Sequence, residues 1–402
     1  MPRAANSKLE TRNSKLVELL LSWFAANARD LPWRRTRDPY AIWVSEIMLQ
    51  QTQVKTVIPY WERWMRELPM IESLAKAHPE KIHKLWEGLG YYTRVRNMQK
   101  AAQEIIATCG RRGDESQIKS SRSGETHVVS YKFPDAFEEI LALPGIGRYT
   151  AGAICSIAFN QPTPILDGNV IRVLTRVFGI AENPKEKSAN AHLWNLAEDL
   201  VLHASRFTFH VSPCSHLNQS LMELGALICT PREPKCLVCP IAKHCFAFQK
   251  NRVDKFPNLD KRPAATARRF AAFVLDHRGK ILVCQRPEGV VNAHLWEFPN
   301  LELNGSPADA TSAATELFGF VPKEMKSLCT IKHSITRYRI TVEAYRIGAP
   351  VSDPARKDKI TPTRRVRRPA LQGRWLPLSE LQKLSFPSAH GKILKALQAT
   401  LS

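Results

Sequence analysis

The sequence predicts a mainly α-helical domain that carries a cysteine-rich loop, followed by a smaller α+β domain. Over the first two thirds of the chain, apolar residues recur at helical spacing and strand-like alternation is absent. After about residue 268 the period changes. Two apolar runs there flank the turn signal DHRGK at 276–280, and YRITVEAYRI at 338–347 is a further strand candidate.

The helical part predicts a series of helices joined by short turns. In chain order they cover 14–28, 40–68, 79–89, 94–110, 136–143, 148–160, 169–179, 190–204 and 218–230. Residues 110–131 interrupt the pattern with polar, Gly- and Ser-containing sequence, which is typical of an insertion. We therefore expect one helical domain over residues 8–249.

The span 250–267 has few large apolar residues, two prolines and many charges, as interdomain linkers do. It is followed by the α+β domain, which we expect to cover 268–402. Within that domain the span 355–374 combines many basic residues with several prolines. It is expected to be a loop that can contact phosphates.

Composition indicates a globular protein with a polyanionic partner. Of 402 residues, 58 are basic and 37 acidic, which gives a formal net charge of +21 spread along the whole chain. This balance favours nucleic acid over an anionic membrane surface. No apolar stretch is long enough to span a membrane, and the start of the chain lacks the apolar segment of a signal peptide, so an intracellular location is expected.

Four of the nine cysteines form the most specific motif in the chain. Cys229, Cys236, Cys239 and Cys245 follow the spacing Cys-x6-Cys-x2-Cys-x5-Cys. Such an all-sulfur set in a reducing compartment suits zinc or a four-iron four-sulfur cluster. Zinc ribbons usually supply two separate Cys-x2-Cys pairs, whereas a single pair is present here. The spacing therefore favours the cluster and leaves zinc open.

A glycine-containing turn precedes the predicted helix 148–160. Gly145 and Gly147 in LPGIGRYTAGA would leave the first amides of that helix free to face an anion. A dinucleotide-binding turn is the rival interpretation, because Asp167 follows at about the ribose-binding spacing. Thr150 at the third glycine position and a preceding helix disfavour it. Helix, glycine turn and helix suits the binding of one DNA backbone phosphate.

Two acidic residues lie among apolar neighbours. From the helix alone, Glu46 in IWVSEIMLQQTQV is more simply an exposed residue of an amphipathic helix. In a closed pocket, however, desolvation would raise its pKa and suit it to general acid work. Asp167 in LDGNVIR is, from its local sequence alone, a turn or helix-capping residue.

Polar and aromatic residues near these motifs suit contacts with bases. QQTQ beside Glu46, which contains Gln50, Gln51 and Thr52, offers hydrogen-bond donors and acceptors for base edges. Tyr91 in GLGYY offers a ring that can stack or wedge between bases.

In their order, the motifs resemble the helix-hairpin-helix DNA glycosylases of the endonuclease III superfamily, specifically the adenine DNA glycosylases of the MutY type. The resemblance rests on LPWRRTRDPYAIWVSEIMLQQTQV, GLGYYTRVRN, LPGIGRYTAGA, ILDGNVIRV and the cysteine motif. It covers about residues 10–250 apart from 110–131, and LWEFP at 295–299 resembles the family's Nudix-like domain.

The resemblance implies a fold and an activity. The fold is a helix-hairpin-helix glycosylase domain with one 4Fe-4S cluster in the loop 229–245, followed by a Nudix-like lesion-recognition domain. The activity is base-excision repair, in which adenine opposite 8-oxoguanine or guanine in double-stranded DNA is removed by hydrolysis of its N-glycosidic bond.

Roles for single residues are also implied by the resemblance. Glu46 protonates adenine N7 and then assists water attack, and Asp167 stabilises the oxocarbenium-like sugar, which replaces the turn interpretation. Tyr149 and Asn169 hydrogen-bond around this pair, while Gln51 and Tyr91 assist extrusion of the base. The family's base-pocket positions match Arg29, Trp33, Arg34, Leu49, Gln219 and Met222.

Related glycosylases that also cut the strand have a lysine where this chain has Tyr149. A monofunctional enzyme that forms no Schiff base is therefore expected. Two alternatives remain open. An endonuclease III-like glycosylase for another base is disfavoured by the long C-terminal part and the missing lysine. A non-catalytic iron–sulfur DNA-binding protein is disfavoured because both Glu46 and Asp167 are present. We expect a monomer in a bacterial cytoplasm, associated with the nucleoid.

The C-terminal domain departs from its family in two places. A Nudix hydrolase needs several glutamates to hold magnesium, and ADATSAATELFGF supplies only Glu316, so nucleotide hydrolysis is not expected. The family reads 8-oxoguanine through a Phe-Ser-His loop, and Ile335, Thr336 and Arg337 stand in its place. Thr336 keeps a hydroxyl, but Arg337 is a permanent cation that only donates, so the strength of lesion recognition is open. In a simpler interpretation the strand only packs in the domain, with its arginines in solvent.

Overall fold

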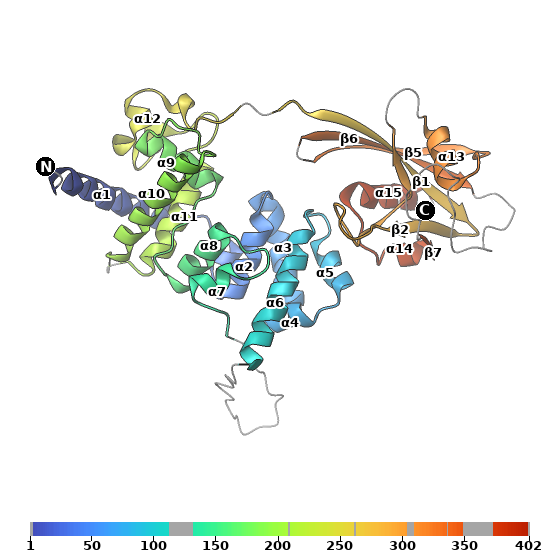
Figure 1. Cartoon of the computed structure of the whole chain (residues 1–402), viewed down its shortest axis with the longest axis horizontal. Helices are drawn as coiled ribbons and strands as arrows, with labels where there is room; N and C mark the ends of the chain where they lie inside the picture. The colour runs from blue at the N-terminus through green and yellow to red at the C-terminus, as the bar shows by residue number, and fades with distance from the viewer. Residues whose placement is uncertain are drawn as a thin grey trace, which may run out of the picture. The chain divides into compact units, whose positions relative to one another are not determined.

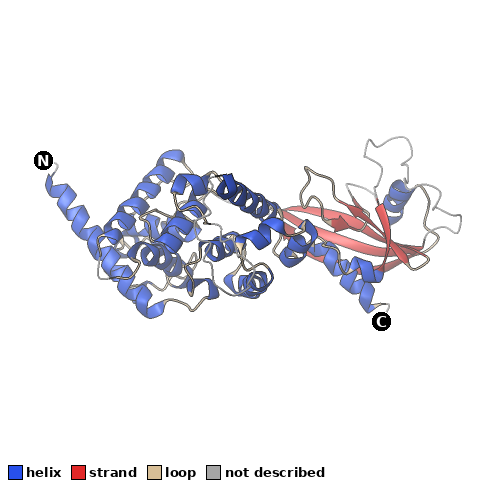
Figure 2. Cartoon of the chain, turned by 90° about the horizontal axis from the view of Figure 1, so that it is seen from below, coloured by secondary structure: helices blue, strands red, loops and turns tan. Residues whose placement is uncertain are grey.

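A computed structural model describes residues 3–111, 132–207, 210–260, 263–303, 309–335, 337–348 and 373–400. It divides the chain into two compact units, Met1–Lys76 with Asn97–Lys261, and Ala77–Arg96 with Arg262–Ser402. The first unit is helical and the second contains a β-sheet, which confirms the predicted fold class (Figures 1 and 2). Most of the predicted insertion and of the basic span 355–374 lies outside the described residues.

The first unit consists of helices joined by short turns and 3-10 segments. They are α1 (Arg3–Asn27), α2 (Pro39–Leu49), α3 (Val54–Glu67), α4 (Ile71–Lys76), α6 (Thr93–Arg111, which begins in the second unit), α7 (Phe137–Leu141), α8 (Arg148–Phe159), α9 (Gly168–Phe178), α10 (Lys187–Ser205), α11 (Pro213–Leu227) and α12 (Phe246–Gln249). Helices α1, α8, α9, α10 and α11 enclose one core in which Val17, Leu193 and Leu217 are fully buried. Burial of each such side chain contributes about 2 kcal/mol.

One predicted helix is wrong. The span 40–68 forms two helices, because the chain leaves helical geometry at Gln50 and re-enters it after Gln53. Gln51 between them has φ of 57°, a left-handed conformation that residues with a side chain rarely adopt. No glycine or proline marks this break, so periodicity alone did not reveal it. The break places the polar residues 50–53 on a turn.

The second unit is built on one sheet with the strand order β3-β2-β1-β6-β5, in which β4 pairs with β1 and β7 with β2. The strands are β1 (Thr266–His277), β2 (Lys280–Gln285), β3 (Trp296–Glu297), β4 (Asn300–Glu302), β5 (Met325–Ile335), β6 (Tyr338–Gly348) and β7 (Gly373–Pro377). The predicted hairpin at 276–280 joins β1 to β2, with Arg278 and Gly279 both at positive φ.

Helices complete the second unit. They are α5 (Pro79–Trp86), α13 (Ala310–Phe318), α14 (Leu378–Leu381) and α15 (Ser388–Ala399). One apolar cluster contains sheet residues with Ile393 of α15, and another contains sheet residues with Phe318 of α13. Among the described residues, no helix has the length and apolar character needed to cross a membrane.

Candidate active site and cysteine loop

Most of the predicted pocket residues line a single cavity of about 580 Å³ in the helical unit. They are Arg29, Trp33, Arg34, Glu46, Leu49, Gln50, Gln51, Thr52, Tyr149, Asp167, Asn169, Gln219 and Met222. The cavity therefore brings together side chains from α2, α8, α9 and α11, although they lie almost 200 residues apart in sequence. Its size is within the range of small-molecule sites.

Glu46 is buried in the middle of α2 with 5% of its surface exposed, so the exposed position that the helix alone suggested is wrong. Burial raises the pKa of its carboxyl group to about 7, and the negative charge of Asp167 acts in the same direction. The Tyr149 hydroxyl donates a hydrogen bond of 2.8 Å to Glu46 Oε2, which partly opposes that rise. Glu46 can therefore hold a proton near neutral pH.

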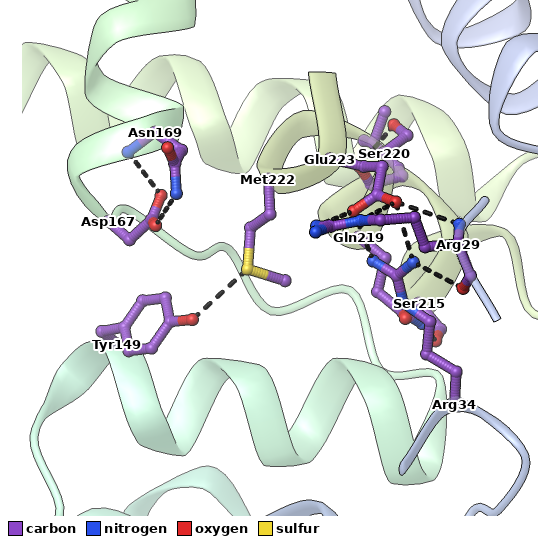
Figure 3. A network of polar contacts seen from close by, with 11 residues as sticks. Arg29, Arg34, Tyr149, Asp167, Asn169, Ser215, Gln219, Ser220, Met222 and Glu223 are labelled. Carbon is purple, nitrogen blue, oxygen red and sulfur yellow. Dashed lines mark hydrogen bonds and ion pairs between the residues drawn. The ribbon is translucent and has the colours of Figure 1, made fainter. Parts of the chain in front are cut away.

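Tyr149 is fixed between the acid and a thioether. Its hydroxyl lies 2.8 Å from Glu46 Oε2 and 3.3 Å from Met222 Sδ, a contact that Figure 3 shows. Burial and the neighbouring carboxylates raise the pKa of this phenol well above its ordinary value. The group thus stays a neutral hydrogen-bond donor.

Asp167 caps α9 and also lines the cavity, so both the capping interpretation and the pocket position are correct. Its Oδ1 accepts hydrogen bonds from the backbone N–H of Asn169 (3.0 Å) and of Val170 (2.7 Å), and its Oδ2 accepts one from Asn169 Nδ2 (2.8 Å). Figure 3 shows the contacts with Asn169. Three donors fix the orientation of the carboxylate at a helix N-terminus, where a negative charge is favoured.

Behind Asp167, a chain of hydrogen bonds leads to the cysteine loop. The Asn169 side-chain oxygen accepts from Arg172 (2.8 Å), and Arg172 Nε donates to the backbone oxygen of Cys229 (2.7 Å). Gly225 makes this packing possible, since a Cβ at that position would lie 2.6 Å from Asn169 Cβ. Helices α9 and α11 therefore meet at a point that only glycine fits.

Glu223 is a pocket residue that the sequence analysis missed. Its side chain is 1% exposed and accepts five hydrogen bonds from Arg29 and Arg34, at 2.7–3.1 Å (Figure 3). Burial alone would raise the pKa of this carboxyl, but the hydrogen bonds from the two arginines lower it to about 2. Its position among apolar residues in SLMELGAL is the same signal that singled out Glu46.

Other residues predicted to contact the base either bond neighbouring side chains of the pocket or have a left-handed backbone conformation. Gln219 Nε2 donates to Ser215 Oγ (3.1 Å), and the Trp33 ring contacts Trp61 edge to face. In the second unit, Tyr91 has φ of 48° and is 44% exposed. Gln51 and Tyr91, the two residues expected to assist base extrusion, are thus both in the left-handed region, where strain of this kind often marks function.

The predicted glycine turn joins α7 to α8. Gly145 has φ of 77°, and a Cβ there would lie 2.6 Å from the Asn97 side chain. Gly147 is the N-cap of α8 and supplies no side-chain cap, which leaves the first amides of that helix free of such a partner. Because α7 and not a strand precedes the turn, the dinucleotide-binding interpretation is wrong.

All four predicted metal ligands line one small apolar cavity, together with side chains of α9, α11 and α12. Burial raises the pKa of the Cys239 thiol to about 12, so only a bound metal would keep it as a thiolate. Within the described part of the chain, no three acidic, histidine or cysteine side chains are arranged around a single ion.

Charge around that cavity also suits an anionic group. Arg172 and Arg176 of α9 are 9% and 3% exposed, and neither bonds a carboxylate among the residues that the structure describes. Buried cations without an anion are costly, and an iron–sulfur cluster bound by four thiolates is negatively charged. The residues present therefore fit such a cluster.

In the second unit, two of the residues predicted to recognise the opposite base, Ile335 at the end of β5 and Arg337 just before β6, are described. Arg337 is exposed, its guanidinium donates to the Tyr338 hydroxyl (3.0 Å), and its centre lies 5.2 Å from the Tyr338 ring centroid. Thr336 lies outside the described residues. Helix α13 carries Glu316 as its one acidic residue.

Comparisons with known proteins match both parts of the chain. The HhH-GPD superfamily base excision DNA repair protein family matches residues 44–199, and the NUDIX domain family matches residues 270–396. Adenine DNA glycosylase of Mus musculus is 35% identical over 82% of this chain and 70% of its own length, and that of Homo sapiens is 32% identical over 94% and 73%. Adenine DNA glycosylase of Buchnera aphidicola subsp. Schizaphis graminum is 36% identical over 71% and 74%.

Among solved structures, a thermostable thymine-DNA glycosylase is 29% identical with a TM-score of 0.49, covering 60% of this chain and 98% of that one. The long relatives decide the family, because they extend over both the helical unit and the sheet. The chain belongs to the adenine DNA glycosylases, the base-excision repair hydrolases that remove adenine from DNA by cleaving its N-glycosidic bond.

Proposed function

We propose that this glycosylase removes adenine opposite 8-oxoguanine or guanine, and that Glu46 and Asp167 carry the reaction. The observation that carries the proposal is the pair itself. One cavity contains a buried acid with a pKa raised to about 7 and a carboxylate fixed by three hydrogen-bond donors. Cleavage of a glycosidic bond uses a proton donor and a second carboxyl group beside the sugar.

In this mechanism Glu46 donates its proton to N7 of the flipped adenine, which turns a poor leaving group into a neutral one. Tyr149 holds the Glu46 carboxyl in place through its hydroxyl. Asp167 faces the sugar and stabilises the positive charge that develops as the bond breaks. Glu46, now a carboxylate, assists the attack of water on the sugar.

The arginine pair held by Glu223 forms the far side of the pocket. The Glu223 carboxylate accepts five hydrogen bonds, so the role of Glu223 is to hold Arg29 and Arg34 rather than to exchange a proton. Access to the pocket requires extrusion of the adenine from the duplex, which costs a few kcal/mol. Gln51 and Tyr91 assist by occupying the vacated stack.

The product is an abasic site and not a cut strand. Tyr149 stands where related lyases have lysine, and none of the described residues that line the cavity is a lysine. Without an amine, no Schiff base with the sugar forms. Efficient strand cleavage by the purified protein without added alkali would contradict this part of the proposal.

Cys229, Cys236, Cys239 and Cys245 are proposed to hold one 4Fe-4S cluster. The shared apolar cavity supports it, as does Arg176, a buried arginine of the cavity lining that bonds no carboxylate among the described residues. The cluster would cross-link a loop that presents Arg232, Lys235 and Lys243 to DNA. Gly145 and Gly147 add a backbone site for one phosphate, and Thr336 with Arg337 reads the base opposite the adenine. A monomer in a bacterial cytoplasm stays a prediction.

The test is single-turnover cleavage of labelled duplexes that carry A opposite 8-oxoguanine, G, T or C, developed with alkali. Adenine release from the 8-oxoguanine and G pairs is expected, and Glu46→Gln and Asp167→Asn should each abolish it. Circular dichroism of both variants controls for folding. If neither pair releases adenine although the wild type binds these duplexes, the proposed substrate is wrong.

A further inference from the structure

Arg176 is a buried cation whose hydrogen bonds reach both the chain around the first cysteine and the chain beyond the last one. It lies on α9, is 3% exposed, and donates to the backbone oxygens of Thr230 (2.8 Å) and Pro231 (3.5 Å). A further bond of 3.0 Å reaches the Phe256 oxygen, beyond the end of the cysteine loop. The guanidinium thus joins the segment that enters the loop to the segment that leaves it.

The same guanidinium also contacts a ligand atom directly. Arg176 Nη1 lies 3.3 Å from Cys229 Sγ. Cys229 is additionally held through its backbone, because its N–H donates to the Leu224 oxygen (2.7 Å) and its oxygen accepts from Arg172 (2.7 Å). Cys229 is therefore held by hydrogen bonds at its nitrogen, its oxygen and its sulfur.

We propose that Arg176 is a positioning residue for the iron–sulfur cluster. Its guanidinium holds the Cys229 sulfur in place and raises the reduction potential of the bound cluster. The proposal rests on the proposed cofactor. An N–H donor and a positive charge at a ligand sulfur stabilise the more negative, reduced form. In a buried setting this interaction is only weakly screened. Loss of the charge makes the cluster easier to oxidise.

The chain supplies a matched control next to the last cysteine of the same loop. Arg12 of α1 donates to the backbone oxygens of Val177 (3.0 Å) and His244 (3.1 Å) and, among the described residues, bonds no sulfur. Arg12→Gln therefore removes an arginine that holds the loop without removing a charge bonded to a ligand. The Arg12→Gln variant therefore tests only the effect of losing hydrogen bonds to the backbone near the loop.

The experiment uses the full chain purified without oxygen, as wild type, Arg176→Gln, Arg176→Lys and Arg12→Gln. Iron and acid-labile sulfide are counted first. Protein-film voltammetry then gives the reduction potential of the cluster. The rate at which a chelator removes iron measures how firmly the protein retains the cluster. Wild type without iron and sulfide, or with zinc, shows that the cofactor proposal fails, and this inference with it.

With wild type loaded, Arg176→Gln should shift the potential to a more negative value, whereas Arg176→Lys and Arg12→Gln should stay close to wild type. Arg176→Lys keeps the charge but cannot span the same acceptors, so it should lose iron at least tenfold faster than Arg12→Gln. An unchanged potential in a loaded Arg176→Gln overturns the proposal. If that variant does not load, equal iron loss from Arg176→Lys and Arg12→Gln overturns it instead.

Discussion

Three acids of the same pocket illustrate how surroundings set chemistry at the scale of a residue. Glu46 has one hydrogen-bond donor and a pKa raised to about 7 by burial, whereas Glu223, equally out of contact with water, has five donors and a pKa lowered to about 2. Asp167 accepts from backbone amides at a helix N-terminus. The number of donors, and not burial alone, decides which acid can give a proton.

The raised pKa of Glu46 predicts a pH dependence of catalysis. A general acid must be protonated, so the single-turnover rate on an A:8-oxoguanine duplex should fall about tenfold per pH unit above about pH 7. The Tyr149 hydroxyl lowers the pKa of Glu46, and Tyr149→Phe should therefore move the midpoint to higher pH. Rates measured from pH 6 to 9 check both statements, and a midpoint that moves down contradicts the second.

The lowered pKa of Glu223 predicts that its contribution to the free energy of unfolding depends on pH. The folded state holds the ionised form, so this stabilisation is present above the ordinary value of 4.5 and is lost as pH falls towards 2. Glu223→Gln leaves Arg29 and Arg34 without their counter-charge and should cost about 3 kcal/mol of unfolding free energy at pH 7. The difference from wild type should shrink at pH 3.

Urea denaturation at both pH values measures the effect. The matched control is Glu18→Gln, which breaks the exposed Lys15–Glu18 pair, with side chains 50% and 51% exposed. Such pairs contribute little, so Glu18→Gln should stay close to wild type at both pH values. Equal destabilisation by the two substitutions would mean that Glu223 is no special support of the pocket.

At the scale of elements, apolar residues at helical spacing predicted most helices, and Gly145 with Gly147 predicted the turn before α8. Periodicity failed where the physical cause is not periodic. The turn at 50–53 has no breaker residue, and the six-residue α4 is too short for a period to be visible. Glu223 went unnoticed because its partners, Arg29 and Arg34, lie almost 200 residues away, and only the packed structure brings them together.

The contact between α9 and α11 predicts an activity effect from a residue outside the reaction. In Gly225→Ala the new Cβ would lie 2.6 Å from Asn169 Cβ and push that side chain away from Asp167. We expect a loss of about 1–3 kcal/mol in unfolding free energy. The adenine-release rate should fall further, by about 100-fold, since misplaced groups of this kind are costly for catalysis.

Gly391→Ala in α15 is the control, because a Cβ there meets no atom closer than 4.0 Å. Alanine favours helices over glycine, so this variant should keep full activity and unfold no more easily than wild type. Single-turnover rates and urea midpoints of both variants distinguish the two sites. Full activity in Gly225→Ala would show that Asn169 does not need its position.

At the scale of the whole molecule, the cavity and the cysteine loop belong to one compact unit, whereas Arg337 belongs to the other. A net charge of +21 spread over the chain favours DNA binding that weakens with salt but selects no base. In the proposed function, base removal and choice of the opposite base are assigned to different residues. They should respond separately to substitution.

This separation gives the last prediction. Thr336→Ala combined with Arg337→Ala should lower the preference for 8-oxoguanine:A over G:A in a competition assay, because it removes a hydroxyl and the exposed guanidinium at the β5–β6 turn. Arg339→Ala removes an exposed charge two residues further along and should leave that preference unchanged. Both variants should keep the pH midpoint of wild type, since Glu46 lies in the other unit. An unchanged preference in the double variant would assign the choice of the opposite base to other residues, and a shifted midpoint would mean that the two units act as one.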